Sequence, residues 1–323
     1  MQARINNVLT QIESVVLGKP HECRLALACL LAQGHLLIED LPGMGKTTLA
    51  HVLANTLGLS YQRTQFTSDL LPADIIGFSI FNNSTNKFEL HKGPIFSQVV
   101  LADEINRASP KTQSALLEAM AEQQVSIDGE THNLPNPFFV IATQNPLFHA
   151  GTYPLPESQL DRFMMRISLG FPNVAAEKKI LLSKNSKETN NINNNISAIS
   201  VEEFTTMQKH VQQVHAENDV IEYIIALCQL TRGQLAHNQA MKEDQPELAC
   251  KPLSPRAGKA LLAASKAWAF INDRNFVIPD DVQAIFNAVC QHRIELNAQN
   301  YMNNKSPLCE QIIKGVDVLN PLK

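Results

Sequence analysis

The segment around residue 45 has the residue types that bind a nucleoside triphosphate. An apolar run that ends at Asp40 is followed by Leu41-Pro42-Gly43-Met44-Gly45-Lys46-Thr47-Thr48, which opens a predicted helix. A phosphate-binding loop needs glycines that let successive backbone N–H groups turn toward the phosphates, a lysine that reaches the β and γ phosphates, and a hydroxyl that holds Mg²⁺. Gly43, Gly45, Lys46 and Thr47 supply these groups, and Pro42, Met44 and Thr48 complete the loop. The sequence therefore predicts a Walker A loop that binds ATP with Mg²⁺.

One position of this loop departs from the common pattern. Asp40 stands where the first glycine is usual, so its carboxylate has to point away from the phosphates. A glycine-rich turn without a ligand is the alternative interpretation. The predicted strand before the loop and the predicted helix after it favour the phosphate site.

A pair of acidic residues supports the first motif. Val99-Val100-Leu101-Ala102 is an apolar run that ends in Asp103 and Glu104. In a Walker B strand the first carboxylate orders the Mg²⁺ shell and the second polarises the attacking water. Successive side chains of a strand point in opposite directions, so the two residues can divide these tasks. A solvent-exposed acidic strand end is the alternative, and the Walker A loop upstream argues against it.

The elements that position these residues follow a clear order. Residues 1–170 alternate helical stretches with five runs rich in β-forming residues, namely HLLIED, YQRTQF, VVLADE, FFVIAT and MMRISL. Continuous apolar strands separated by helices indicate a parallel sheet covered on both faces. Residues 171–323 contain helical patterns only, with AEKKILL, VIEYIIALCQL and SPRAGKALLAASKAWAFI as the clearest. The sequence thus predicts an α/β nucleotide-binding domain (1–170) followed by a smaller all-α domain (171–323).

Two hairpins are predicted beside the sheet, at about residues 77–93 and 124–135. In the first, β-forming residues flank an Asn-rich turn; in the second, Asp128-Gly129 is a strong two-residue turn signal. Both are expected to protrude from the edge of the sheet. The Asn- and Ser-rich segment 184–200 and the polar segment 236–252 are predicted loops, because Asn and Ser side chains compete with helical backbone bonding.

Composition narrows the class of protein. The 323 residues include 27 Lys and Arg against 31 Asp and Glu, and no dense basic run, which argues against nucleic acid as the partner. The N-terminus lacks the apolar block of a signal peptide, and the apolar stretch from Leu25 to Ile38 is interrupted and too short to span a bilayer. The six cysteines form no CxxC pair or metal-ligand spacing. We therefore expect a cytoplasmic protein with reduced thiols and no membrane insertion.

Longer strings in the sequence are more specific than these motifs. LADEINRASPKTQSALLEAMAEQQVSIDG, ATQNP, GTYPLPESQLDRF and SPRAG closely resemble the MoxR family of AAA+ ATPases, and the resemblance extends roughly from Val16 to Val289. It implies a P-loop AAA+ core followed by a helical lid, and an enzyme that converts ATP to ADP and phosphate. It also implies that the adenine pocket begins at Val16 and Gly18.

The resemblance assigns roles to three further residues. Asn145 matches sensor 1, whose amide holds the attacking water or the γ-phosphate; a buried turn-forming Asn is the alternative. Arg162 matches the arginine finger that enters the neighbouring subunit's site, and a local salt bridge to Asp161 or Glu157 is its alternative. Arg256 matches sensor 2, which reaches from the lid to the γ-phosphate, and a plain helix-start arginine is its alternative.

A finger supplied by a neighbour leaves no monomer with a complete site, so the resemblance implies a homo-oligomer, expected to be a hexameric ring, that remodels a partner protein. Hairpins in such proteins line or crown the central pore. There Phe78, Phe81 and Phe88 would grip the partner, and packing of these rings onto the neighbouring hairpin is the alternative. Family members commonly work with proteins that bear a von Willebrand factor A domain. The rival functions are a nucleic-acid motor or loader and a slow, nucleotide-gated assembly scaffold.

Overall fold

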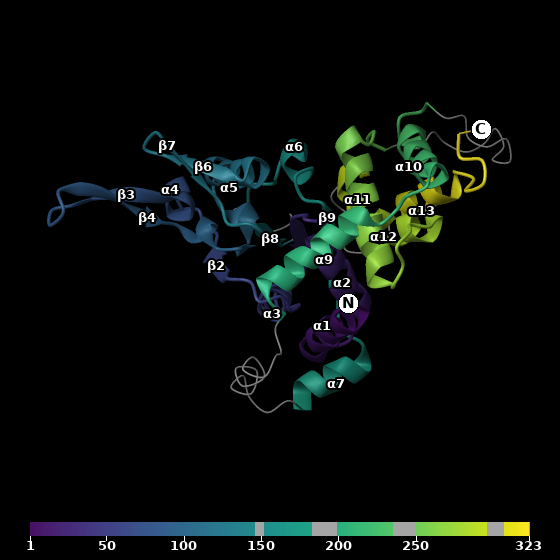
Figure 1. Ribbon diagram of the computed structural model, residues 1–323, viewed down its shortest axis with the longest axis horizontal. Coiled ribbons are helices and arrows are strands. Elements are labelled where there is room, and N and C mark those ends of the chain that lie inside the picture. The colour runs from purple at the N-terminus through teal and green to yellow at the C-terminus, as the bar shows by residue number, and fades with distance from the viewer. Residues whose placement is uncertain (146–151, 183–198, 235–249, 296–306, 323) are drawn as a thin grey trace.

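In the computed structural model, the N-terminal part of the chain folds around a five-stranded parallel sheet (Figure 1). The structure describes residues 1–145, 152–182, 199–234, 250–295 and 307–322. The strand order is β2-β5-β8-β1-β9, and every neighbouring pair is parallel. The strands are β1 (Leu36–Glu39), β2 (Tyr61–Gln65), β5 (Val99–Asp103), β8 (Phe139–Gln144) and β9 (Met165–Ile167). Each of the five predicted runs forms one of these strands.

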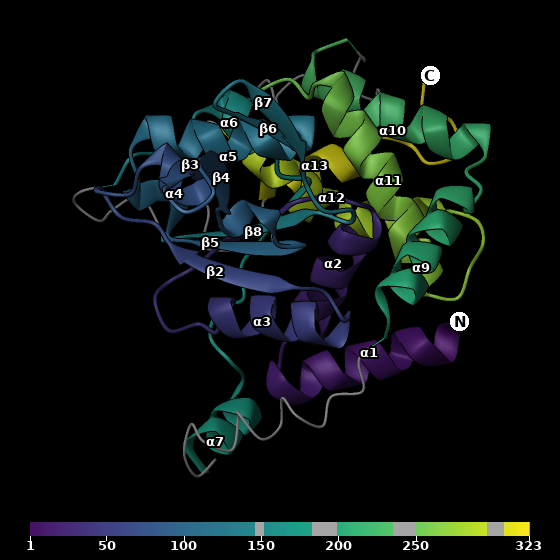
Figure 2. The same cartoon turned by 60° about the vertical axis from the view of Figure 1, so that its left-hand side comes forward.

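Helices cover both faces of the sheet, which explains why its central strands are continuously apolar. Alternate side chains of β1 enter two separate hydrophobic clusters, because Leu36 and Ile38 face one side and Leu37 faces the other. Figure 2 shows α1 and α3 below the sheet and α5 above it. The helices of this part are α1 (Gln2–Val15), α2 (Pro20–Leu31), α3 (Lys46–Thr56) and α5 (Pro110–Glu122). The predicted α/β class is confirmed.

Both predicted hairpins are present. The first consists of β3 (Gly77–Asn82) and β4 (Lys87–Lys92), which follow the short helix α4 (Pro72–Ile76), and it extends away from the body in Figure 1. The second consists of β6 (Gln124–Ile127) and β7 (Glu130–Asn133) and lies against α5 and β3. Its turn residues Asp128 and Gly129 have φ values of 51° and 86°, the backbone that the Asp-Gly pair favours.

Beyond residue 170 the described residues are helical, as predicted, apart from one isolated bridge between His215 and Phe276. The short helix α6 (Glu157–Leu160) precedes β9, and the described helices after residue 170 are α7 (Val174–Leu182), α9 (Val201–Gln213), α10 (Asn218–Thr231), α11 (Pro255–Ile271), α12 (Pro279–Ile294) and α13 (Pro307–Lys314). Short 3₁₀ turns occur at Pro94–Phe96 and Ile105–Arg107. Most of the two segments predicted as loops, 184–200 and 236–252, lies outside the described residues.

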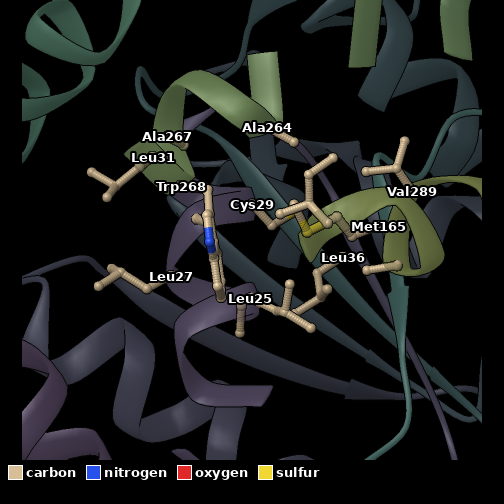
Figure 3. Close-up of a cluster of buried hydrophobic side chains, with 14 of the residues drawn as sticks. Leu25, Leu27, Cys29, Leu31, Leu36, Met165, Ala264, Ala267, Trp268 and Val289 are labelled. Atoms are coloured by element: carbon tan, nitrogen blue, oxygen red, sulfur yellow. The ribbon is translucent and has the colours of Figure 1, made fainter. Parts of the chain in front are cut away.

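The helical part packs directly on the α/β part. Trp268 of α11 lies among side chains of α2 such as Leu25 and Leu27, and Met165 of β9 lies near Val289 of α12 (Figure 3). The hydrophobic cluster is therefore continuous from the sheet into the helices. The boundary at residue 170 stays a prediction. Among the described residues, no helix combines the length and the apolar character needed to cross a bilayer.

Candidate nucleotide site

The carboxyl ends of β1, β5 and β8 bring the predicted site residues together. These strands are neighbours and parallel, so the residues that follow them meet at one edge of the sheet. Glu39 pairs with Gln144, which places Asp40 beside Asn145. Such an edge, where strands give way to loops, is where open α/β sheets bind their ligands.

The loop between β1 and α3 has the backbone of a phosphate cradle. Gly43 and Gly45 both have φ of 84°, a left-handed conformation that residues with a Cβ rarely adopt. A Cβ on either glycine would meet no atom within 4 Å, so backbone geometry, not crowding, requires glycine here. Gly45 is the N-cap of α3, and the N-terminus of a helix favours an anion.

Lys46 is buried at the centre of this edge, with 7% of its surface exposed. Its Nζ donates to Asn145 Oδ1 at 2.7 Å, to the backbone oxygen of Asp40 at 2.5 Å and to that of Gln144 at 3.3 Å. Burial lowers the pKa of Lys46, and the nearby carboxylates of Asp40 and Asp103 oppose this effect. All three acceptors are uncharged, so a bound triphosphate would give the Lys46 ammonium a directly hydrogen-bonded anion.

Asp40, the departure from the common loop pattern, is bound on its other side. Its Oδ2 accepts hydrogen bonds from Gly170 N at 2.6 Å and from Ser168 Oγ at 3.1 Å, and its Oδ1 accepts from Leu41 N at 2.8 Å. The carboxylate therefore ties the start of the loop to the segment that follows β9. This orientation agrees with the expectation that it points away from the phosphates.

Asp103 ends β5 with a nearly saturated carboxylate. Thr143 Oγ1 donates to its Oδ1 at 2.5 Å, and Arg63 donates to its Oδ2 through Nε at 3.1 Å and Nη2 at 2.7 Å. A carboxylate offers about four lone-pair positions, and these three bonds leave one. Hydroxyl and carboxylate oxygens are the ligands that Mg²⁺ prefers, so Thr47 and Asp103 fit a magnesium ion by their chemistry.

Glu104 has an unusual backbone that directs its side chain across the edge. Its φ of 57° lies in the left-handed region, which costs a non-glycine residue roughly 1–3 kcal/mol. Thr143 Oγ1 accepts the Glu104 N–H at 2.9 Å. The Glu104 carboxylate then accepts from Asn145 Nδ2 at 2.8 Å and from Gln65 Nε2 at 2.9 Å, and it forms an ion pair with Arg107, whose Nε lies 2.9 Å away.

Asn145 therefore links the two motifs through one amide. Its oxygen accepts from Lys46 and its nitrogen donates to Glu104, and its side chain is almost fully buried. This is more than the alternative of a turn-forming Asn requires. A single side chain at the end of β8 thus positions the lysine of the loop relative to the acid of β5.

Sequence reasoning missed three residues that hold the acidic pair. Arg63 and Gln65 are two apart on β2, so both reach the β5 acids from the same face of the strand. Arg107 is three residues after Glu104 and pairs with it. The run of four polar residues inside YQRTQF, unusual for a strand of this sheet, was an available signal.

A buried ion pair fixes the end of β1. Glu39 Oε2 accepts from Arg166 Nη1 at 3.1 Å and from Gln144 Nε2 at 3.0 Å, so β1 is fastened to both of its neighbours just before the loop begins. Burial raises the pKa of Glu39, and Arg166 opposes that rise. Arg166 also lies 3.9 Å from a carboxylate oxygen of Glu295, just after α12.

The two predicted arginines lie away from this edge. Arg162 donates to the backbone oxygen of Leu117 on α5. Among the described residues, Arg162 forms no salt bridge with Asp161 or Glu157, the alternative for its role, and those carboxylates pair with other cations. Asp161 pairs with Arg293 at 2.7 Å and with Arg256 at 3.5 Å, and Glu157 pairs with Lys251 at 2.6 Å.

The predicted start of the adenine pocket lies between α1 and α7. Gly18 has φ of 73°, and a Cβ at this position would be 2.8 Å from the Cβ of Ala176 on α7. Lys19 Nζ donates to the backbone oxygen of Phe171 at 2.7 Å, and Val16 is 8% exposed. The α1–α2 loop therefore contacts the segment that continues from Gly170.

Known proteins share this arrangement. Residues 35–165 match the model of the ATPase family associated with various cellular activities (AAA), and residues 247–312 match that of the AAA lid domain. Over 91% of this chain and 88% of the relative, it is 43% identical to the uncharacterised protein YeaC of Bacillus subtilis (strain 168).

Two further relatives match over most of their length. The chain is 34% identical to chaperone MoxR1 of Mycobacterium tuberculosis (strain ATCC 25618 / H37Rv), over 94% of this chain and 78% of that protein. The crystal structure of a candidate ATPase from Cytophaga hutchinsonii ATCC 33406 superposes with a TM-score of 0.82 at 36% identity, over 98% of this chain and 95% of that one. With the parallel sheet, the loop and the acidic pair in place, these likenesses show that the chain belongs to the MoxR family of AAA+ ATPases.

Proposed function

We propose that this ATPase hydrolyses MgATP at interfaces between copies of itself, in a ring that we expect to be hexameric, and uses the cycle to remodel a partner protein. The observation that carries the proposal is the bridge of Asn145 between Lys46 and Glu104 at the carboxyl edge of the sheet. It joins a phosphate-binding cation to a carboxylate that can polarise water.

Each residue of this edge has a defined task in the proposal. The amides of residues 43–48 and the Lys46 ammonium hold the phosphates. Thr47 and Asp103 would hold Mg²⁺, which neutralises phosphate charge when bound. Glu104 orients the attacking water, and Asn145 keeps that carboxylate and Lys46 in register.

The position of the arginines supports an interface between copies. β9 runs parallel to β1 with Met165 opposite Leu36, so Arg162, just before β9, lies at the amino edge of the sheet. The loop that holds Lys46 starts at the carboxyl edge, and the four residues of β1 span about 13 Å between the two edges. Arg256 lies at the amino edge as well, because it pairs with Asp161. Their distance from the loop of their own copy supports a contact of both guanidiniums with the triphosphate of another copy.

This arrangement revises the expected role of Arg256. A lid arginine of this kind was expected to reach the γ-phosphate from the helical lid. In the proposal Arg256 instead accompanies Arg162 into the neighbouring site, because Asp161 lies next to one and pairs with the other. An arginine finger is worth about 10³ to 10⁵ in rate, or about 4 to 7 kcal/mol of barrier.

The surface for the partner protein would be the β3–β4 hairpin. Phe78, Phe81 and Phe88 are 42%, 47% and 73% exposed, and the rings of Phe81 and Phe88 pack edge to face 5.3 Å apart. Exposed aromatic side chains of this kind suit contact with another protein. A partner with a von Willebrand factor A domain is part of the proposal, as is work in the cytoplasm, where the six free cysteines would stay reduced.

Mixing two inactive variants tests the shared site. Arg162→Ala lacks the finger and Glu104→Gln lacks the acid, so each alone should be nearly inactive. A mixed ring contains sites where an intact Glu104 meets an intact Arg162 from the next copy, and turnover should partly return. Absence of any recovery, at every mixing ratio, would contradict a finger supplied by a neighbour.

The same assay separates the rival functions. Turnover that DNA stimulates in a salt-dependent manner would favour the nucleic-acid motor. Turnover that stays slow when a remodelled partner is added would favour the assembly scaffold. The partner for this assay is identified by pull-down from native lysate with the Glu104→Gln variant, followed by mass spectrometry.

A further inference from the structure

Helix α7 carries large apolar side chains that the rest of the described chain leaves exposed. Val174, Leu181 and Leu182 are 83%, 80% and 69% exposed, and Ile180 is 50% exposed. The buried residue of this helix is Ala176, which faces Gly18. Figure 2 shows α7 projecting below α1 and α3. Four such side chains on nine residues are typical of a surface that binds protein.

An apolar groove lies at the opposite end of the molecule, between α10 and α11. We call it the α10–α11 groove; its cavity measures about 320 Å³, and its walls include Ile221, Ile225 and Leu262. Arg232, Lys259 and Pro255 also line it. Ile225 is 42% exposed, so this wall of the groove is open to solvent. Figures 1 and 2 both show α7 at the bottom of the molecule and α10 at its upper right.

Each surface begins at a part of the proposed shared site. The segment before α7 is bound by Asp40 through Gly170, at 2.6 Å, so α7 starts beside the nucleotide loop. The α10–α11 groove starts at Pro255, next to Arg256. If Arg256 of one copy reaches the triphosphate bound by the next copy, the groove of the first copy lies close to α7 of the second.

The dimensions of the two surfaces agree. The nine residues of α7 span about 13 Å, and the stretch of α11 from Pro255 to Leu262 spans about 11 Å. Glu177 lies on the face of α7 that carries Val174 and Leu181, which offers a carboxylate to the rim of the groove. Lys178 and Lys179 leave α7 without a net negative charge, so apolar contact and not charge would drive the association.

We propose that α7 of one copy docks in the α10–α11 groove of the next copy, as a second contact of the ring beside the shared nucleotide site. A contact between two different surfaces of the same chain is heterologous, and repetition of it closes a ring or extends a filament. This inference rests on the proposed function, because the ring is what brings the two surfaces together.

Single polar substitutions test the contact. Leu181→Asp on α7 and Ile225→Asp in the groove place a charge on an exposed side chain, so the monomer still folds. Each should weaken ATP-dependent self-association about tenfold or more, as measured by sedimentation velocity, since burial of an apolar side chain is lost. Leu319→Asp, 87% exposed near the C-terminus, is the matched control and should not change it. Unchanged association in both test variants overturns the contact.

Cross-linking identifies the occupant of the groove. In a Cys250→Ser background, a chain with Leu181→Cys is mixed with a chain with Ile225→Cys, and a mild oxidant such as copper phenanthroline is added to accept the two electrons of the thiols. The expected product is an intermolecular disulfide that forms when ATP is present. Pairing Ile225→Cys with Phe88→Cys instead tests the hairpin as occupant. A product with Phe88→Cys and none with Leu181→Cys would overturn the proposal.

The two proposals fail in different ways. If Arg162→Ala and Glu104→Gln rescue each other but no Leu181–Ile225 product forms, the shared site stands and the α7 contact is wrong. If ATP induces neither association nor rescue, both are wrong.

Discussion

Replacement of Asn145 by alanine tests the bridge at the centre of the site. The change removes the donor to Glu104 at 2.8 Å and one of three acceptors around Lys46. A hydrogen bond to a charged group contributes about 1.5–3 kcal/mol. If the bond to Glu104 acts in the transition state, turnover should fall about 10- to 150-fold. ATP affinity should change much less, because Lys46 keeps two carbonyl acceptors.

The assay measures turnover at saturating ATP and the dissociation constant of ATP separately. Asn145→Asp is informative beside it, because aspartate keeps an acceptor for Lys46 but places a second carboxylate against Glu104, and turnover should fall as well. Gln283→Ala removes an amide donor to Tyr223 in the lid and serves as the matched control. Turnover of Asn145→Ala within about threefold of the native protein would refute the reasoning.

Three further predictions concern the nucleotide site and the buried His35. Lys46→Ala should abolish ATP binding while Glu104→Gln keeps binding and stops hydrolysis; equal loss of binding, measured by calorimetry, would contradict the Walker assignments. Gln65→Ala removes one of the two partners of Glu104 Oε2, which keeps its ion pair with Arg107 at 2.9 Å, and should raise basal turnover about two- to tenfold, the value of one exposed hydrogen bond; a decrease would contradict this. Burial lowers the pKa of His35 to about 4. Below about pH 6.5 only the unfolded chain binds this proton, so the free energy of unfolding should fall by up to about 3 kcal/mol toward pH 4, and urea titrations of His35→Gln should lack that loss.

The strands and the loop were predictable because each is encoded locally. Continuous apolar runs fix buried parallel strands, and Gly43 and Gly45 before Lys46 fix the turn between β1 and α3. Asp128-Gly129 fixed the second hairpin in the same way. Each of these signals fits within about ten residues, so neither the rest of the chain nor its packing has to be known.

The contacts around the acids were not predictable in this way. Gln65 and Glu104 are 39 residues apart, and Arg63 and Asp103 are 40 apart. Such pairs depend on strand order, since β2 lies beside β5 only because the chain crosses over to place it there. The left-handed backbone of Glu104 was not predictable either, because glutamate adopts this conformation only with strain, whereas glycine adopts it freely.

The ion pairs around Asp161 explain why the positions of the two arginines were the hardest to predict from the sequence. Asp161 joins Arg293 of α12, 132 residues away, and Arg256 at the start of α11, and it does so one residue before Arg162. A sequence motif names each arginine separately and suggests that Arg256 reaches its own nucleotide. The ion pairs hold the start of the lid helix α11 and α12 against the segment just before β9. In the proposed ring, the position of the lid, and not the residue type alone, would therefore decide whether Arg256 acts within one copy or across an interface.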